Sequence, residues 1–411
     1  MSDGPRAHDP LLALRNRDYR AFAIGFLLSG MGLQMLATGI GWEIWERTKD
    51  ELMLGYIGLA RALPVLVLAL PAGQAADVFD RRIVLFLTQV AFAVCCALLT
   101  LSSASSAPLW VAYTLLVLTG CARSCNAPAR NGLVPLLVGP GELHNAMTWN
   151  SALFQFAAVT GPLLGGLLID VCGAAWPVYA ATTVCCAGAA VQALRLRPRP
   201  QQRAEGRFTL ASMTAGAGFL LREKTVLATL LLDLFAVLLG GATALMPVFA
   251  DRMDVGAVGL GALRAAPYVG AFLMALLLAH RPPFVRAGRA LLLSVAGFGV
   301  LTIAFGLSTW FPLSLLLLAG LGALDNISVV VRSVLVQVRT PDDLRGRVNA
   351  VNSVCIESSN ELGAFESGLV ARLFGPVASV VSGGIGTIAV VLGIAWLWPE
   401  VRRLGRLEVE S

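Results

Sequence analysis

The feature that most constrains this chain is a succession of apolar stretches, each about 20 residues long and separated by short polar segments. Such a stretch crosses the hydrocarbon core of a bilayer when it is helical. The stretches lack the strict alternation of apolar and polar residues that membrane β-strands show. Charged residues make up only 14% of the sequence, which is too few to cover the surface of a soluble globule. We therefore predict an all-α membrane protein.

The stretches divide the chain into two similar halves. Twelve can be delimited, at residues 21–45, 53–74, 82–102, 108–130, 144–169, 174–194, 226–250, 258–280, 289–308, 311–338, 347–371 and 376–398. We predict twelve transmembrane helices in two six-helix bundles, because the longest polar interval follows the sixth stretch. The predicted segments are a cytoplasmic N-terminal segment 1–20, an N-terminal bundle 21–195, a cytoplasmic linker 196–225, a C-terminal bundle 226–400 and a cytoplasmic tail 401–411.

Basic residues set the predicted orientation. Of the 31 Lys and Arg residues, 23 fall on the side of the N-terminal segment, four on the opposite side and four inside the spans. Loops rich in Lys and Arg stay in the cytoplasm, so both chain ends are predicted there. The start of the chain does not match a cleavable signal, and the first span is expected to be retained. The net charge of +6 arises from these loops and does not indicate a nucleic-acid partner.

A weak internal repeat relates the two halves. Three matches occur at nearly one offset, which favours duplication, as in transporters built from parallel repeats. The matches are Arg61-Ala-Leu-Pro64 with Arg264-Ala-Ala-Pro267, Asn150-Ser151 with Asn352-Ser353, and Arg130 with Arg332, at offsets of 203, 202 and 202.

The turn between the second and third spans is short and charged. It reads Gly73-Gln-Ala-Ala-Asp77-Val-Phe-Asp80-Arg81-Arg82. Gly73 allows close helix approach, and Asp77 can accept backbone N–H groups at a helix start or pair with an arginine. The turn resembles the signature loop of the major facilitator superfamily, Gly-x-x-x-Asp-basic-x-Gly-basic-basic, although Val78 and Asp80 depart from it. The alternative is an ordinary basic cytoplasmic turn.

The fifth span contains a second motif, Gly161-Pro162-Leu-Leu-Gly165-Gly166. Proline frees backbone groups and bends a membrane helix, and glycine permits close packing around the bend. The motif resembles the Gly-Pro motif of exporters in the same superfamily, with Ala157 in place of its leading glycine. A flexible, closely packed span is the alternative interpretation.

Further segments extend this resemblance over residues of roughly 15 to 400. They resemble the enterobactin-exporter-like branch of the superfamily, and they are Asn16-Arg-Asp-Tyr-Arg20, Gly132-Leu-Val-Pro135, Thr340-Pro-Asp-Asp-Leu-Arg-Gly-Arg-Val348 and Glu366-Ser-Gly368. The resemblance implies a two-bundle transporter that opens alternately to either side. It also implies that spans one, four, seven and ten line a central cavity, flanked by spans two, five, eight and eleven.

Carboxylates in the eleventh span are the first candidates for a site. Glu357 and Glu361 are four residues apart and share a helix face, and Glu357 lies about 15 Å from the start of the span. An ionisable group at the bilayer centre costs at least ~2.5 kcal/mol, so it usually faces a cavity or a partner. We interpret both as proton or substrate groups. Fixed ion pairs between helices are the alternative.

Three more charged residues are predicted to face the cavity from its cytoplasmic half. They are Asp233 in span seven, Asp325 in span ten and Arg123 in span four. Arg123 would attract an anionic group, and the two aspartates could hold such a group or a proton.

Other intramembrane charges are predicted to form gates. Glu43 with Arg61, and Arg264 with Glu361 or Glu366, are candidate pairs near the outer side, with snorkelling to the interface as the alternative. Arg130 and Arg332 are expected to pair with loop carboxylates such as Asp77, or with lipid phosphates.

The sequence as a whole predicts a monomeric, proton-coupled exporter of a small organic molecule, siderophore or drug-like, in the cytoplasmic membrane of a bacterium. Import or lipid flipping by the same fold is the alternative within transport. An intramembrane enzyme or a non-transporting sensor is the alternative from another class. No ATP-binding or dinucleotide motif is present, and no cofactor or metal is predicted, because Cys121 and Cys125 have no His or carboxylate beside them.

Overall fold

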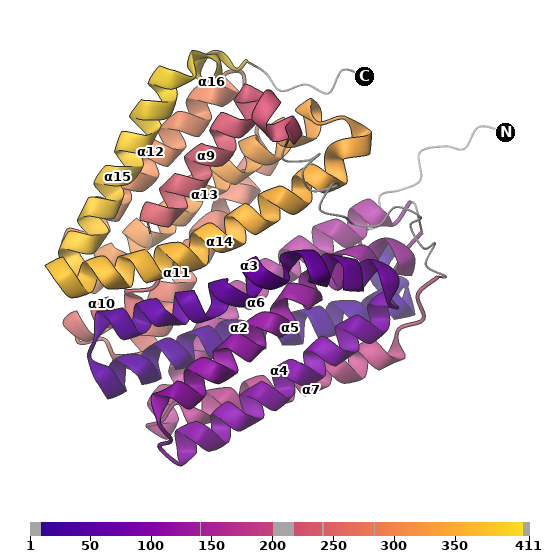
Figure 1. Cartoon of the computed structure of the whole chain (residues 1–411), viewed down its shortest axis with the longest axis vertical. Coiled ribbons are helices and arrows are strands. Elements are labelled where there is room, and N and C mark those ends of the chain that lie inside the picture. Colours follow the sequence, from indigo (N-terminus) through magenta and orange to yellow (C-terminus); the bar gives the residue numbers. More distant parts are fainter. Residues whose placement is uncertain (1–9, 140, 200–217, 241, 283, 406–411) are drawn as a thin grey trace.

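The computed structural model describes residues 10–139, 141–199, 218–240, 242–282 and 284–405, and these residues form two helical bundles (Figure 1). The N-terminal half consists of α2 (Arg17–Thr48), α3 (Glu51–Val78), α4 (Arg81–Ala104), α5 (Leu109–Leu137), α6 (Leu143–Cys172) and α7 (Trp176–Arg195). The C-terminal half consists of α9 (Lys224–Leu239), α10 (Met246–Arg252), α11 (Gly256–Ala279), α12 (Ala287–Leu307), α13 (Phe311–Arg339), α14 (Asp342–Phe374) and α15 (Pro376–Leu397). Short helices α1 (Leu12–Arg15) and α16 (Pro399–Arg403) flank the bundles.

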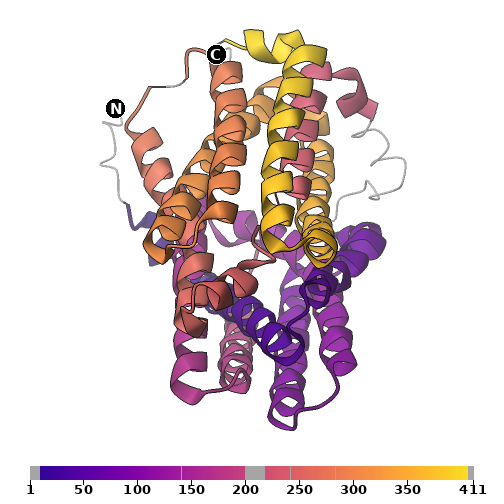
Figure 2. The ribbon, with the colours of Figure 1, turned by 90° about the vertical axis from the view of Figure 1, so that its left-hand side faces the viewer.

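The all-α prediction is confirmed, and most helices follow the expected spans within a few residues. The fourth span is longer than expected, because α5 continues to Leu137 and not only to residue 130. In the view turned by 90°, the orange and yellow helices of the C-terminal half again lie above the indigo and violet helices of the N-terminal half (Figure 2). Residues 200–217 of the predicted linker lie outside the described part of the chain. We call the end of the bundles near residues 16, 80, 137 and 195 the linker end, and the opposite end, near residues 49, 105, 173 and 254, the distal end.

Nine of the described helices are long and apolar enough to cross a membrane by themselves. The predicted fourth, seventh and eleventh spans are not among these nine. The fourth span carries Arg123 and Arg130, and the eleventh carries Glu357 and Glu361. The spans that depart most from a simple apolar helix therefore hold the charged side chains of interest.

We expected the seventh span to be one helix over residues 226–250, and this prediction is wrong. The span is broken into α9 and α10, and the described residues between them form turns. Gly240 is the C-cap residue of α9, and glycine is a poor helix former. Close approach of α15 also contributes, because a β-carbon at Gly383 would collide with the carbonyl oxygen of Leu239. Broken helices occur in transporters where freed backbone groups border a cavity.

Polar caps fix the linker end of the N-terminal half. Asn16 caps α2 by accepting the backbone N–H groups of Asp18 and Tyr19, and its side chain donates to the carbonyl oxygen of Leu137 at 2.9 Å. The buried Tyr19 hydroxyl donates to the carbonyl oxygen of Ala146 at 2.7 Å. These bonds join α2 to α5 and α6, so the start of the first span is held firmly to its own bundle.

The two halves meet mainly through two helix pairs, α3 with α14 and α6 with α11, and α2 also contacts α10 and α11. Both main contacts depend on glycine. A β-carbon at Gly58 would collide with the carbonyl oxygen of Glu361, and one at Gly166 would collide with that of Ala257. Small residues allow membrane helices to approach this closely. These contacts lie toward the distal end, and we call them the glycine seal.

Ion pairs add to the contact between the halves at the distal end. Lys49 contacts Asp251 at 3.3 Å, and Arg372 contacts Asp50 at 3.8 Å. The side chains of Lys49 and Arg372 are about half exposed, so each ion pair contributes little stability by itself. The distal end is therefore closed mainly by helix packing.

Candidate functional site

A cavity of about 400 Å³ lies between the halves on the linker-end side of the glycine seal. Most of its wall comes from α2, α4, α5 and α7 of the N-terminal half, and the C-terminal half contributes Arg264, Tyr268 and Glu357. We call it the main cavity. None of its lining residues comes from α9 or α13, so the expectation that spans seven and ten line the central cavity does not hold here.

Four arginines and one carboxylate line the main cavity. The arginines are Arg61, Arg123, Arg130 and Arg264, and the carboxylate is Glu357. Arginine remains charged at all physiological pH values. The cavity wall therefore carries a surplus of positive charge, which favours a ligand with a negative group.

Arg123 bridges the two halves at the floor of the cavity. Its guanidinium group contacts a carboxylate oxygen of Glu357 at 2.8 Å and one of Glu361 at 3.3 Å. Arg123 belongs to α5, whereas both glutamates lie one turn apart on α14. The structure thus brings together three residues that we predicted separately, and their ion pairs are part of the interface between the halves.

A second cavity of about 160 Å³ lies on the distal side of this cluster. It is lined by Arg61, Arg264 and Glu361, together with Thr243 from the break between α9 and α10. Arg61 and Arg264 line both cavities, so they stand in the partition between them. Their matching positions agree with the repeat found in the sequence.

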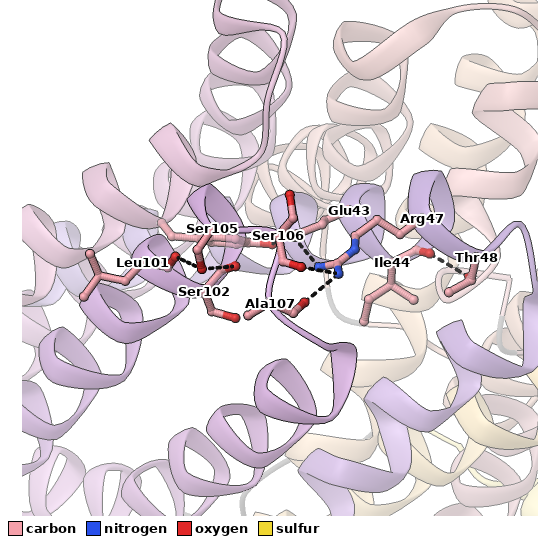
Figure 3. A network of polar contacts seen from close by, with 10 residues as sticks. Glu43, Ile44, Arg47, Thr48, Leu101, Ser102, Ser105, Ser106 and Ala107 are labelled. Carbon is pink, nitrogen blue, oxygen red and sulfur yellow. Dashed lines mark hydrogen bonds and ion pairs between the residues drawn. The ribbon is translucent and has the colours of Figure 1, made fainter.

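Glu43 does not pair with Arg61 as predicted. It accepts hydrogen bonds from Arg47 at 3.2 Å and from the Tyr179 hydroxyl at 2.6 Å. Arg47 also donates to the carbonyl oxygens of Ser106 and Ala107, which ties α2 to the loop after α4 (Figure 3). Glu43 faces α7, whereas Arg61 lies between the two cavities. The position of a residue along its helix gives its depth in the membrane, but it does not give the direction of its side chain.

The predicted cavity positions of Asp233 and Asp325 are wrong. Asp233 on α9 forms a buried ion pair with Arg332 on α13. Asp233 and Asp325 line a void of only about 10 Å³ inside the C-terminal half, apart from the main cavity. Arg332 is 6% exposed and so is not the peripheral anchor that we expected. Depth in the membrane was predicted from sequence, but rotation about the helix axis was not.

Arg130 does line the main cavity, and its guanidinium lies 5.1 Å from the centre of the Phe26 ring. An arginine over an aromatic face gains a cation–π interaction and keeps its donors available. It is therefore placed to contact a ligand, whereas the side chain of its expected partner Asp77 lies outside the described part of the structure.

The charged turn between α3 and α4 fastens helices of the N-terminal half to one another. Arg81 donates to the carbonyl oxygen of Gly132 at 2.8 Å, and Arg82 donates to those of Ala193 and Leu194. Asp80, which departs from the signature pattern, caps α4 by accepting from the backbone N–H of Arg82 at 2.8 Å. Gly73 and Asp77 belong to α3, but their side-chain surroundings lie outside the described part of the structure.

The Gly-Pro motif serves close contact in two directions. Gly161 and Gly165 face α2, where a β-carbon at Gly161 would lie 2.6 Å from the β-carbon of Gln34. Pro162 and Gly166 face α11 in the other half and contribute to the glycine seal. The motif therefore lies where α6 packs closely against both α2 and α11.

Several polar cavity residues were missed from sequence. Gln89 donates to Ser29 at 3.0 Å, and Asn126 donates to Thr88 at 2.8 Å, between α2, α4 and α5. The available signal was the presence of Gln89 in the middle of an otherwise apolar span. In the part of the chain that the structure describes, no group of three or more His, Cys, Asp or Glu side chains could hold a metal ion.

The fold and the cavity define a membrane transporter built from two bundles. Residues 22–364 match the family profile of the Major Facilitator Superfamily, and the chain belongs to this family. It is therefore a multi-pass membrane protein and a secondary transporter.

Curated relatives and solved structures agree with this membership. The chain is 27% identical to the enterobactin exporter EntS of Escherichia coli O1:K1 / APEC over 388 residues, which cover 94% of this chain and 92% of that protein. A bacterial homolog of the human lysosomal transporter Spinster, inward-facing and occupied, matches with a TM-score of 0.73 and 14% identity, covering 96% of this chain and 99% of that one. The nucleoside transporter NupG matches with a TM-score of 0.72 and 14% identity, covering 93% and 99%.

Proposed function

We propose that the protein is a proton-coupled exporter, in a bacterial inner membrane, of a small organic molecule that carries an acidic group. The relative EntS is an enterobactin exporter, which supports export and the size class of the substrate. The distribution of Lys and Arg supports a cytoplasmic position for both chain ends. The linker end is then cytoplasmic, and the main cavity takes substrate from that side.

The observation that carries this proposal is the bridge from Arg123 to Glu357 and Glu361 across the two halves. Each carboxylate can accept a proton, whereas Arg123 stays charged. A protonated carboxylate loses its ion pair with Arg123, and the contact between the halves weakens. Proton binding and the opening of the distal end are thereby linked through one cluster.

The substrate class follows from the charge of the main cavity. The arginines of its wall outnumber its single carboxylate, and Arg61 and Arg264 have no ion pair of 4 Å or less among the described residues. A carboxylate or ionised phenol on the substrate would contact these guanidinium groups as charge-assisted hydrogen bonds.

The same surplus of arginine favours a second candidate, an anion carrier driven by the membrane potential alone. One elementary charge crossing 100 mV gains about 2.3 kcal/mol, and a potential that is negative inside drives an anion outward without any proton. This candidate makes the glutamates structural partners of Arg123 rather than proton carriers.

Reconstitution in proteoliposomes separates the two candidates, with iron-free enterobactin as the first probe. Under a pH gradient with the potential clamped at zero, we expect concentrative transport by the wild type. Glu357→Gln and Glu361→Gln should abolish it but retain exchange of labelled for unlabelled substrate. Glu400→Gln, in the peripheral helix α16, is the control. Transport that needs only a membrane potential, and is unchanged in both glutamine variants, would refute proton coupling and favour the second candidate.

A further inference from the structure

A groove that adjoins the main cavity, with Ala21 and Gln192 lining both, lies between α2 and α7 at the linker end. It has a volume of about 470 Å³, and its lining residues are Arg17, Arg20, Ala21, Ile24, Gln192 and Arg195. Three of these six are arginines and none is a carboxylate. The proposed transport mechanism uses none of the three.

The three arginines have no ion pair within the described residues, and their side chains are exposed. The nearest acidic residue along the chain, Asp18, accepts instead from the backbone N–H of Arg197 at 3.2 Å. The groove therefore concentrates positive charge that the described residues do not neutralise. A ligand with a phosphate or other compact anion would complete it.

Exposed apolar side chains lie one helical turn further into the membrane, in the wall of the groove and near it. Ile24 lines the groove, follows Arg20 by one turn on α2 and is 43% exposed. Val191 is not a lining residue, but it precedes Arg195 by one turn on α7 and is 48% exposed. A free phosphate would gain no favourable contact from these apolar side chains. A phospholipid would place its phosphate at the arginines and an acyl chain along Ile24 and Val191.

The groove belongs to the N-terminal half alone. At the repeat offset of 202, the positions of Arg17, Arg20 and Arg195 correspond to Phe219, Arg222 and Leu397. Only one of the three charges is kept in the C-terminal half. The C-terminal half has its basic residues at other positions of this end, so the cluster of Arg17, Arg20 and Arg195 is a feature of the N-terminal half and is not produced by the repeat.

We propose that this groove binds the headgroup of an anionic phospholipid from the leaflet at the linker end. Basic pockets between transmembrane helices recognise such headgroups through phosphate contacts. The lipid would join the start of α2 to the end of α7, and so the first and last helices of the N-terminal bundle. The site is independent of the identity of the transported substrate.

The test compares lipid retention by the purified full-length protein, measured by native mass spectrometry with phosphatidylglycerol or phosphatidylcholine added. The wild type should retain phosphatidylglycerol preferentially. The triple variant Arg17→Gln/Arg20→Gln/Arg195→Gln should lose about ten-fold or more in affinity for it, because it removes all three charges that would contact the phosphate. The control is Arg281→Gln/Arg286→Gln/Arg289→Gln, which removes the same charge at the linker end of the C-terminal half and should bind like the wild type.

Further arms separate a lipid from other sources of the same chemistry. Ile24→Asn, which keeps all three arginines, should also weaken phosphatidylglycerol binding. Inorganic phosphate alone should neither compete with the lipid nor raise the unfolding temperature. Equal lipid retention in the triple variant and the wild type would overturn the proposal, as would an equal loss in the control variant or full competition by phosphate.

Discussion

The two halves share a scaffold but differ in their buried charges. Gly120 packs against Pro64 in the N-terminal half as Gly322 packs against Pro267 in the C-terminal half, at the repeat spacing. The N-terminal half presents arginines to the main cavity. The C-terminal half instead buries the Asp233–Arg332 pair, and its α14 supplies both glutamates that bind Arg123.

This contrast teaches that helix packing and site chemistry follow different constraints after a duplication. Packing contacts between glycine and proline keep the bundle closed in each half, and so they stay matched. The charged residues have separate tasks, which the pair Arg130 and Arg332 shows best. The guanidinium group of Arg130 lies over the Phe26 ring at the main cavity, whereas its repeat partner Arg332 forms a buried ion pair with Asp233.

The largest effect on stability should come from removing the buried ion pair between Arg332 and Asp233. Arg332→Gln leaves Asp233 buried without its partner, which costs about 3 kcal/mol or more. We expect a clear fall in the unfolding temperature of the detergent-solubilised protein. Arg130→Gln should leave that temperature unchanged and reduce transport instead.

A double variant, Asp233→Asn/Arg332→Gln, sharpens this test, since it removes both charges and should recover much of the lost stability. If Arg130→Gln proved as destabilising as Arg332→Gln, the assigned difference between the repeat partners would be wrong.

The next effect should come from the glycine seal. Gly58→Leu places a large side chain against the backbone of Glu361, and overpacking of this kind costs about 2 kcal/mol. We expect the distal end to open, with a loss of transport and faster labelling of a cysteine introduced at the distal side of the cavity. Gly393→Leu is the control, because no atom lies within 4 Å of a β-carbon there.

A smaller effect is expected from the matched arginines of the partition. Arg61→Gln and Arg264→Gln each remove one charged donor from both cavities, and each should raise the KM for an acidic substrate by about ten-fold. Transport assays with an acidic substrate and its neutral amide provide the measurement. If the amide were affected as strongly as the acid, the arginines would not be recognising charge.

The smallest effect should come from the distal ion pairs. Lys49→Gln removes an exposed pair with Asp251, worth below about 1 kcal/mol, and should shift the balance between the two openings by less than about five-fold. Fluorescence distance measurements across the distal end can detect this shift. High salt should shift the wild type in the same direction, and it should have a smaller effect on the variant, in which the Arg372–Asp50 pair remains to be screened.

The contribution of Lys49 should not vary with pH in the physiological range. Burial lowers the pKa of Lys49, but hydrogen bonds to Glu46 and Asp251 outweigh this, and the pKa lies above its ordinary value. A raised pKa in the folded state keeps the contribution intact below the unfolded value of about 10.4, and it is lost only as the pH rises through the folded pKa. A pH-dependent distal contact near neutrality would therefore have to arise elsewhere.

Sequence was sufficient for the scaffold. The predicted span 376–398 agrees with α15 (Pro376–Leu397), and 174–194 agrees with α7 (Trp176–Arg195), because apolar length is set by membrane thickness. The break in the seventh span was missed, although the pair Gly240-Gly241 was a readable signal. The mean hydropathy of a window of about 20 residues changes little when two glycines lie within it. The apolar residues around Gly240-Gly241 therefore kept the mean hydropathy of the span high.

The site was predicted in part only. Arg123, Glu357 and Glu361 were identified from the cost of burying charge, but their mutual pairing required the crossing of α5 with α14. Asp233 and Asp325 met the same criterion and proved to lie inside one bundle. Residue counting gives depth along a helix axis, whereas the direction of a side chain depends on how neighbouring helices pack.

The closure at the distal end is made by main chain lying on main chain. Side chains that interdigitate must each find one rotamer before a contact is complete, and this ordering has an entropic cost every time a contact re-forms. Gly58 packs against the backbone of Glu361, and Gly166 packs against the backbone of Ala257. Because glycine has no side chain, it loses no rotamer freedom when these contacts form. Each cycle of opening and shutting can therefore proceed as a rigid-body step, with a rate set by the swing of whole bundles and with little sensitivity to how individual residues repack.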